Sequence, residues 1–179
     1  MNFIIGADPQ DSSVPALFRD TFSDSEGVEE GALIAEFVTR LLESTPPQDL
    51  FVVSAVESGG LAGCICFSRL IFDQDNRTVF ILSPVAVRTD RQGTGIGQNL
   101  IAFGLEHLRL HGVDIALTYG DPNFYAKVGF QHVSAECVPP PLPLSHPEGW
   151  LGQSLTDAPL HPLMGASRCV EALNNPDLW

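Results

Sequence analysis

The 179-residue sequence is poor in positive charge. Nine lysine and arginine residues stand against 22 aspartate and glutamate residues, which gives a formal net charge of −13 at pH 7. This charge repels phosphate backbones and no basic cluster offsets it, so we do not expect nucleic acid as a partner. With 44% hydrophobic residues and only 17% charged residues, the composition is that of a globular protein.

The sequence also lacks an apolar run of membrane-spanning length, and its first residues lack the basic and apolar regions of a signal peptide. Its four cysteines do not have zinc-site spacing, because Cys64 and Cys66 are not accompanied by a second pair of ligands. Buried thiols are the simpler interpretation. We therefore expect no metal, no membrane association and a reducing, cytoplasmic environment.

Apolar periodicity predicts one α/β domain over residues 1–179. Pro84 interrupts an otherwise apolar strand, which predicts either a bulge or the loss of a neighbouring strand at that point. Gly59-Gly60 predicts a tight hairpin. Asp121, Pro122 and Gly129 have the types expected at the cap, first turn and end of a very short helix. Helices are predicted near 13–23, at 28–44, after the glycine loop at 92–97 with Gly112 just past the end, and as a very short helix within 120–130. Strands are predicted at 3–5, 50–56, 61–72, 78–87, 113–119 and from Phe130, and a proline-rich loop at 138–147 is followed by a tail with a last strand.

Alternate glycines stand directly before one predicted helix, in the segment Gln92-Gly93-Thr94-Gly95-Ile96-Gly97. No lysine follows as in a Walker A loop, and Gln98 stands where a dinucleotide fingerprint needs its last glycine. Bare amides at a helix N-terminus can bind an anion, and a pyrophosphate is the anion that we expect here. The alternative is a glycine-rich turn that allows close helix–strand packing. Arg88 and Arg91 add positive charge beside the loop.

A second motif, "GDPNFYAKVGF" at residues 120–130, follows one helix and one strand later. Together with Q-x-x-G-x-G after a "VAV" strand, it resembles the GNAT N-acetyltransferase superfamily. The similarity is greatest to a bacterial branch of small acetyltransferases with a GDP-x-[FY]-Y-x-x-x-GF segment, and it is dense over residues 78–132. It implies a central, mixed, mostly antiparallel sheet of about six or seven strands with helices on both faces.

The resemblance implies acetyl-CoA as cosubstrate. Its pyrophosphate would bind the glycine-loop amides, its pantetheine arm would lie beside the backbone after Pro84, and Asn123 would contact a pantetheine amide. The cofactor-binding residues so implied are Val85, Ala86, Val87, Arg91, Gln92, Gly93, Thr94, Gly95, Ile96, Gly97, Gln98 and Asn123.

Tyr125 matches the family's usual general acid, which protonates the departing thiolate; a phenol holds its proton at neutral pH and can give it to a more basic neighbour. The alternative role for Tyr125 is a core aromatic residue. The strand before Pro84, "TVFILS", lacks the carboxylate that many members use as a base. A water ordered by Ser83 is the favoured substitute, with Asp73, Asp75 and Glu57 as further candidates.

These features predict acetyl transfer to a primary amine of a small molecule or peptide by direct attack. The acidic charge favours a cationic acceptor such as a polyamine, an aminoglycoside or a peptide N-terminus. The alternative is an acyl-CoA sensor that binds without turnover. Because family members often dimerise, a homodimer is also possible.

Overall fold

The computed structural model describes residues 1–58 and 60–179, so Gly59 of the predicted hairpin lies outside the described residues. Contacts within the chain gather in two compact units. The first comprises Met1–Phe67 and Pro84–Gly104, and the second comprises Ser68–Ser83 and Leu105–Trp179. Among the described residues, no helix is both long and apolar enough to cross a membrane.

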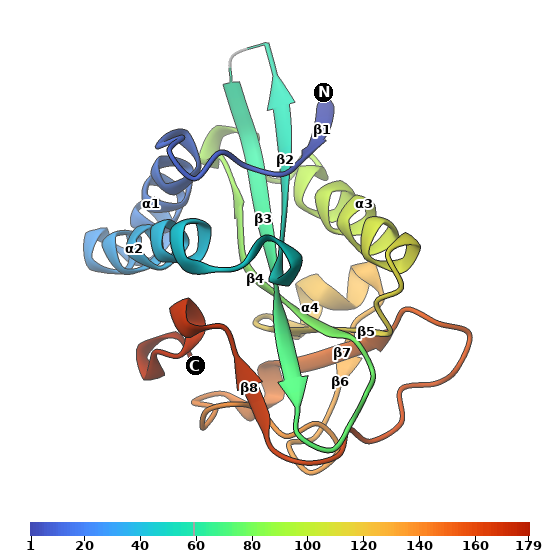
Figure 1. Ribbon diagram of the computed structural model, residues 1–179. Coiled ribbons are helices and arrows are strands. Elements are labelled where there is room, and N and C mark those ends of the chain that lie inside the picture. Colours follow the sequence, from blue (N-terminus) through green and yellow to red (C-terminus); the bar gives the residue numbers. More distant parts are fainter. Residues whose placement is uncertain (59) are drawn as a thin grey trace. The chain divides into compact units, whose positions relative to one another are not determined.

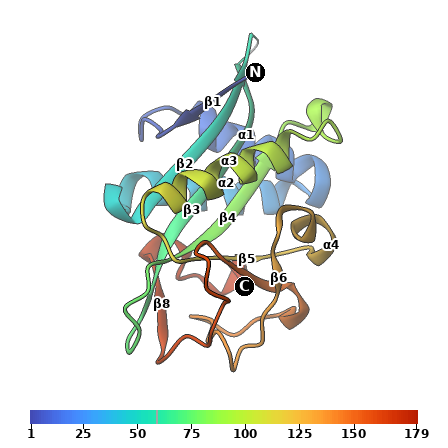
Figure 2. The same cartoon turned by 90° about the vertical axis from the view of Figure 1, so that its right-hand side faces the viewer.

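The first unit has helices on both faces of its strands. Figure 2 shows α1 and α2 behind strands β2 and β3 and α3 in front of them. Its elements are β1 (Asn2–Ile5), α1 (Ser13–Glu26), α2 (Val28–Ser44), β2 (Leu50–Glu57), the first part of β3 (Gly60–Phe72), the last part of β4 (Val79–Val87) and the first part of α3 (Ile96–Leu110). One face of α2 buries Ile34, Phe37, Val38, Leu41 and Leu42. This apolar stripe explains why the sequence predicted α2 with its observed bounds.

Helices α1 and α2 lie side by side in Figure 1 and approach closely at Gly31. A Cβ atom there would stand 2.0 Å from Ser23 Oγ and 2.5 Å from the Arg19 carbonyl oxygen. Real Cβ atoms do not approach other atoms so closely, so only glycine fits this contact.

The second unit contains the other parts of β3, β4 and α3, followed by the remaining short elements. These are β5 (Ile115–Tyr119), α4 (Pro122–Tyr125), β6 (Gln131–His132), β7 (Trp150–Ser154) and β8 (Ser167–Cys169). Strand β5 pairs with β4 in parallel, whereas β5–β7, β6–β7 and β3–β8 are antiparallel. The strands follow the order β1-β2-β3-β4-β5-β7-β6, with β8 beside β3. The predicted mixed, mostly antiparallel fold is confirmed, with eight strands in place of the expected six or seven.

Three local predictions can be compared with the structure directly. The parallel pairing of β4 with β5 ends at Leu82–Thr118, before Pro84, which agrees with the predicted loss of a neighbour. Asp121 caps α4, because its side chain accepts a hydrogen bond from the Asn123 amide, and Gly129 has φ of 93° at the end of the following turn. Strand β7 was not predicted, because it directly follows the proline-rich loop.

Candidate functional site

Gly93 and Gly95 are required by the backbone conformation of the glycine loop and not by close packing. Their φ angles are 73° and 83°, in the left-handed region that side chains disfavour. A Cβ atom at Gly93 would meet nothing within 4 Å, and one at Gly95 would meet only Asn99 Nδ2 at 4.0 Å. The predicted alternative of close helix–strand packing is therefore wrong for these two positions. The α-carbons of Gly93 and Gly95 therefore face open space.

The backbone amides of residues 93–98 form the candidate anion site. The Asn99 amide donates to the Gly95 carbonyl at 3.0 Å, the first bond of the α3 ladder. Within the described part of the chain, none of the six preceding amides has a hydrogen-bond acceptor. Because unpaired amides at a helix N-terminus carry partial positive charge, this segment is suited to bind an anion. Ile96 and Gly97 are buried in the first turn, and Gln98 is half-buried.

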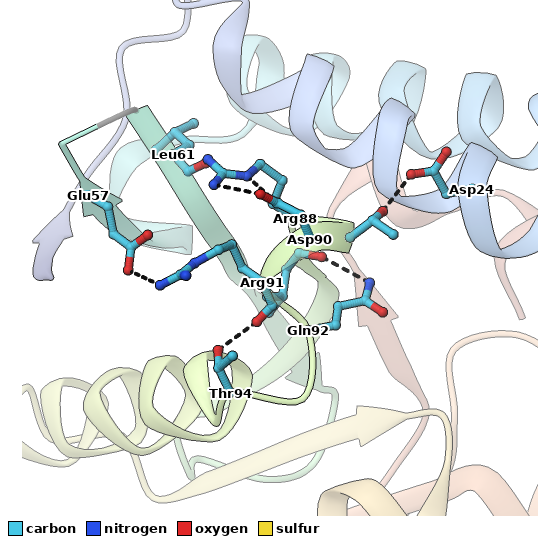
Figure 3. A network of polar contacts seen from close by, with 10 residues as sticks. Asp24, Glu57, Leu61, Arg88, Asp90, Arg91, Gln92 and Thr94 are labelled. Carbon is cyan, nitrogen blue, oxygen red and sulfur yellow. Dashed lines mark hydrogen bonds and ion pairs between the residues drawn. The ribbon is translucent and has the colours of Figure 1, made fainter.

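Arg91, directly before the loop, is held by a carboxylate from the end of β2. Its Nη2 lies 2.6 Å from Glu57 Oε1, and both side chains are more than half buried. The Arg91 carbonyl accepts a bond from Thr94 Oγ1 at 2.6 Å, so Arg91 connects β2 with the loop (Figure 3). The positive charge of Arg91, predicted to lie beside the loop, is therefore paired with the carboxylate of Glu57.

Arg88 is matched in the same way. Its guanidinium binds both oxygens of Asp90, at 2.5 Å and 3.1 Å (Figure 3). The Arg88 guanidinium lowers the pKa of the exposed Asp90 carboxyl, mainly through these hydrogen bonds. Neither arginine offers an unmatched charge, so the bare amides are the principal electropositive groups of the loop.

The loop is also tied to strand β4 and helix α1. Gln92 Nε2 donates to the Val87 carbonyl at 3.0 Å, and Thr89 Oγ1 donates to Asp24 Oδ2 of α1 at 2.5 Å. Gln92, Gly93 and Thr94 are themselves exposed. These contacts attach the exposed loop to β4 and to α1 and leave its backbone amides without a hydrogen-bond partner.

The end of β4 contains the backbone groups that the family resemblance implied as contacts of a pantetheine arm. The Arg88 amide donates to the Ala62 carbonyl of β3 at 2.9 Å. Because successive residues of a strand point their polar groups to opposite sides, the groups of Val85 and Val87 point away from β3. Ala86 between them is buried, whereas Val85 and Val87 are half-buried.

Tyr125 and Asn123 belong to the second unit, on α4. The Tyr125 residue is half-buried, but protein atoms surround its hydroxyl. Burial raises the pKa of the phenol, the charge of Asp121 raises it further, and a hydrogen bond with Thr118 lowers it. The phenol therefore keeps its proton at neutral pH. The side chain of Asn123 donates to Asp121 Oδ1 at 3.2 Å.

The carboxylates considered as general bases are all engaged in ion pairs. Glu57 binds Arg91, Asp73 lies 3.3 Å from Arg168, and Asp75 lies 2.6 Å from Arg77. Arg77 holds the pKa of the Asp75 carboxyl well below its usual range, chiefly by hydrogen bonding. No described group of three or more His, Cys, Asp or Glu residues is arranged to hold a metal ion.

Sequence reasoning missed two residues of this region. Thr118 is fully buried in β5, where its hydroxyl donates to the Leu82 carbonyl, and the only signal was a hydroxyl in the strand "IALTY". Glu57 was considered only as a base, because its pairing with Arg91 spans 34 positions of sequence.

Comparison with known proteins agrees with this geometry. The family model described as Acetyltransferase (GNAT) domain matches residues 47–132. The uncharacterized N-acetyltransferase YjhQ of Escherichia coli K12 is 34% identical over 142 residues, which cover 76% of this chain and 78% of that protein.

Two solved structures share the fold. The GNAT family N-acetyltransferase YhbS from Escherichia coli, in complex with CoA, has a TM-score of 0.82 at 22% identity, covering 97% of this chain and 92% of that one. A GNAT family acetyltransferase from Brucella melitensis, in complex with acetyl-CoA, has a TM-score of 0.72 at 24% identity, covering 97% and 99%. The fold and the relationship to YjhQ together show that the chain belongs to the GNAT family of acetyl-CoA-dependent N-acetyltransferases.

Proposed function

We propose that this protein transfers the acetyl group of acetyl-CoA to a primary amine of a small molecule or peptide by direct attack. The observation that carries the proposal is the run of bare amides at residues 93–98, at the N-terminus of α3. This run fits the pyrophosphate of acetyl-CoA. The structures of YhbS with CoA and of the Brucella protein with acetyl-CoA support this choice of anion.

The pantetheine arm would extend along the end of β4. The backbone groups of Val85 and Val87 point away from β3, and the pairing of β4 with β5 ends at Leu82. Unpaired strand groups seek hydrogen-bond partners, and the amides of pantetheine supply both donors and acceptors. The Val87 carbonyl, which now accepts a hydrogen bond from the Gln92 side chain, would accept one from pantetheine instead or in addition. Asn123 is proposed as a further contact of the arm.

In the proposed reaction, the amine nitrogen attacks the acetyl carbonyl carbon and the carbon–sulfur bond breaks. The thiolate of CoA takes the phenolic proton of Tyr125, whose raised pKa keeps that proton available at neutral pH. The attacking nitrogen loses its proton to water ordered near Ser83. A water base is proposed because the candidate carboxylates of the chain already bind arginines.

A cationic amine is proposed as the acceptor, on the basis of the net charge of −13. Such a charge attracts cations and raises their concentration near the surface. Spermidine, kanamycin and a dipeptide are suitable probes, because they represent a polyamine, an aminoglycoside and a peptide N-terminus.

A sensor that binds acyl-CoA without turnover is the second candidate. The observation that favours it is the absence of a carboxylate in residues 79–87 of β4, together with the engagement of Glu57 by Arg91. Such a protein would bind acetyl-CoA as tightly as an enzyme but would release no CoA thiol with any amine.

The test measures the release of CoA thiol from acetyl-CoA with the three probe amines, for the wild type and Tyr125→Phe. We expect turnover with at least one amine and a loss of about 100-fold or more in kcat for the variant. Calorimetric titration of acetyl-CoA into both proteins is the control, and equal binding is expected. Tight binding without thiol release in the wild type would favour the sensor, and full turnover by Tyr125→Phe would remove the proposed acid.

A further inference from the structure

We propose that strand β1 (Asn2–Ile5) is a dimerisation surface, at which a second copy of this chain extends the sheet by antiparallel pairing of β1 with β1. The inference concerns residues of the first unit only. It goes beyond acetyl transfer and does not depend on it, because none of its residues belongs to the proposed cofactor site.

Strand β1 is paired along one edge only. It stands at the end of the strand order, beside β2, and no strand of the described chain lies on its other side (Figure 1). Directly after β1, the Gly6 amide donates to the Val52 carbonyl at 2.8 Å. In an antiparallel ladder, residues that bond the partner strand alternate with residues whose backbone groups point away from it. The groups of Ile4 therefore point to β2, and those of Phe3 and Ile5 point outward.

The outward backbone groups of Phe3 and Ile5 have no partner. Within residues 1–58 and 60–179, their amides and carbonyls make no hydrogen bond beyond the strand. Edge strands of native proteins are commonly protected by a charged side chain, a proline or a bulge. Residues 1–6, MNFIIG, contain no charged side chain and no proline, and the register of β1 with β2 is continuous. This edge is therefore open to pairing with another strand.

Apolar side chains gather on both faces of this edge. Met1, Ile4 and Ile5 are 57%, 49% and 38% exposed. Phe103 of α3 is 39% exposed, and its ring centroid lies 5.2 Å from that of Phe3. Because side chains of a strand alternate between its faces, Phe3 and Ile5 share the face that carries Phe103, and Ile4 lies on the opposite face. A second strand at this edge removes apolar area from water on both faces.

The charge of the edge fits a second copy of the chain. With a net charge of −13, two copies repel each other, but the uncharged side chains of residues 1–6 add nothing to this repulsion. The edge is also complementary to itself. In antiparallel pairing, Phe3 stands opposite Ile5 of the second copy, and Ile5 stands opposite Phe3 of the second copy. Such an isologous contact closes on itself and leaves neither β1 edge open.

This register places a twofold axis between the two copies of Ile4. Each pair of Phe3 with Ile5 exchanges both N–H···O=C bonds, and the two Ile4 residues form a non-hydrogen-bonded pair with α-carbons about 4.5 Å apart. Ile5 of the second copy lies next to Phe3, on the face that carries Phe103. Because β1 has only four residues, the contact is smaller than that of a permanent dimer, and the dimer dissociates reversibly.

The first test measures the oligomeric state of the full chain by sedimentation velocity, over protein concentrations of about 1 to 300 µM, where small interfaces dissociate. Ile4→Lys places two like charges directly opposite each other at the axis, which destabilises a cross-strand pair. Val28→Lys is the matched control, because Val28 begins α2, is 78% exposed and receives the same change of charge. Thermal unfolding verifies the fold of each variant.

We expect the wild type and Val28→Lys to dimerise reversibly and Ile4→Lys to have a dissociation constant at least several-fold higher. Both lysine variants lower the net negative charge equally. Weaker repulsion between copies therefore acts in the same direction in both, and a loss confined to Ile4→Lys locates the contact at β1.

A second measurement tests the register by cross-linking. Ile4→Cys brings two thiols to the twofold axis, where opposed strand residues approach closely enough for a disulfide. Oxidised glutathione accepts the two electrons and two protons that are released as the S–S bond between the copies forms. We expect Ile4→Cys to form a covalent dimer faster than Val28→Cys. The wild type gives the background from the four native cysteines.

A wild type that is monomeric at every concentration would overturn the inference, and so would a dimer that Ile4→Lys does not weaken. Cross-linking of Ile4→Cys no faster than that of Val28→Cys would overturn the pairing of β1 with β1 in this register. If Ile4→Lys does not fold, the cross-linking rates decide alone. Neither measurement uses acetyl-CoA or turnover, so a failure of the proposed function would leave both results unchanged.

Discussion

Gly95 combines a left-handed backbone conformation with open space around its α-carbon. Gly95→Ala should therefore destabilise the protein by about 1 kcal/mol through backbone strain alone, since no atom lies close enough to clash. Urea unfolding measures this effect, and Asn99→Ala, on the exposed side of the same helix start, is the control with no positive φ. A variant as stable as the wild type would mean that the loop relaxes to another conformation.

The Arg91–Glu57 pair is the residue-scale contact with the clearest electrostatic consequence. Glu57→Gln removes the carboxylate 2.6 Å from Arg91 and leaves a cation beside the amides. We expect acetyl-CoA to bind this variant a few-fold more tightly at low salt, with the gain disappearing at about 0.5 M salt as charges are screened. Calorimetry at two salt concentrations tests this. Weaker binding at both would show that the pair acts by shaping the loop.

Single residues were predictable from sequence where the local backbone demands a type. Gly93, Gly95 and the Asp121 cap follow from such local demands, and the structure has the expected conformation at each. The partners of Arg88 and Arg91 were not predicted. Glu57 ends β2 and Arg91 follows β4, and the two strands lie on either side of β3, so no local pattern signals the pair.

At the scale of elements, one charged turn holds a long loop of the second unit. Asp75 accepts bonds from Arg77 and from the Met164 amide, and Arg77 donates to the carbonyls of His161 and Pro162. Asp75→Asn should therefore cost about 2 kcal/mol at pH 7, because it weakens a mostly buried ion pair.

The same pair gives a pH dependence. Hydrogen bonding from Arg77 lowers the folded-state pKa of Asp75, so the stability from this carboxylate is fully present above the unfolded pKa of about 3.9 and is lost progressively as the pH falls from there toward the lower folded-state pKa. Urea unfolding at pH 7, 4 and 2 should show the difference between the wild type and Asp75→Asn unchanged down to about pH 4 and shrinking below it. A difference of the same size at all three pH values would assign the effect to packing instead.

The contact of α1 with α2 supplies the second prediction for elements. Gly31→Ala places a methyl group against Ser23 and the Arg19 carbonyl, so it should destabilise the protein by about 1–3 kcal/mol despite the higher helix propensity of alanine. Gly104→Ala, whose Cβ would meet side-chain atoms only, with the ring edge of Phe67 at 2.6 Å, should cost less than a clash with backbone. The order of their melting temperatures checks this. The reverse order would contradict it.

Elements were predictable where periodicity is long. Helix α2 and strands β2, β3 and β4 carry apolar patterns of eight or more residues, and their predicted bounds lie within one residue of those observed. Strand β7 has five residues, Trp150–Ser154, and becomes a strand by pairing with β5 on one side and β6 on the other. Such non-local pairing leaves no local signal.

At the scale of the whole molecule, the net charge of −13 bears on the acceptor. We expect the KM for spermidine to rise several-fold between about 0.05 and 0.5 M salt, because screening removes the long-range attraction. Ethanolamine carries only the charge of its single amino group, so its KM should rise much less. Equal salt dependence for both amines would show that acceptor charge does not matter.

The central claim is that the bare amides of the glycine loop bind acetyl-CoA. Calorimetric titration of acetyl-CoA into the wild type, Gly95→Glu and Leu110→Glu tests it most directly. Leu110 is exposed on the last turn of α3, so its variant carries the same added charge away from the loop. We predict binding to the wild type and to Leu110→Glu, and none to Gly95→Glu when circular dichroism shows it folded. Equal binding by all three proteins, or by none, would contradict the account.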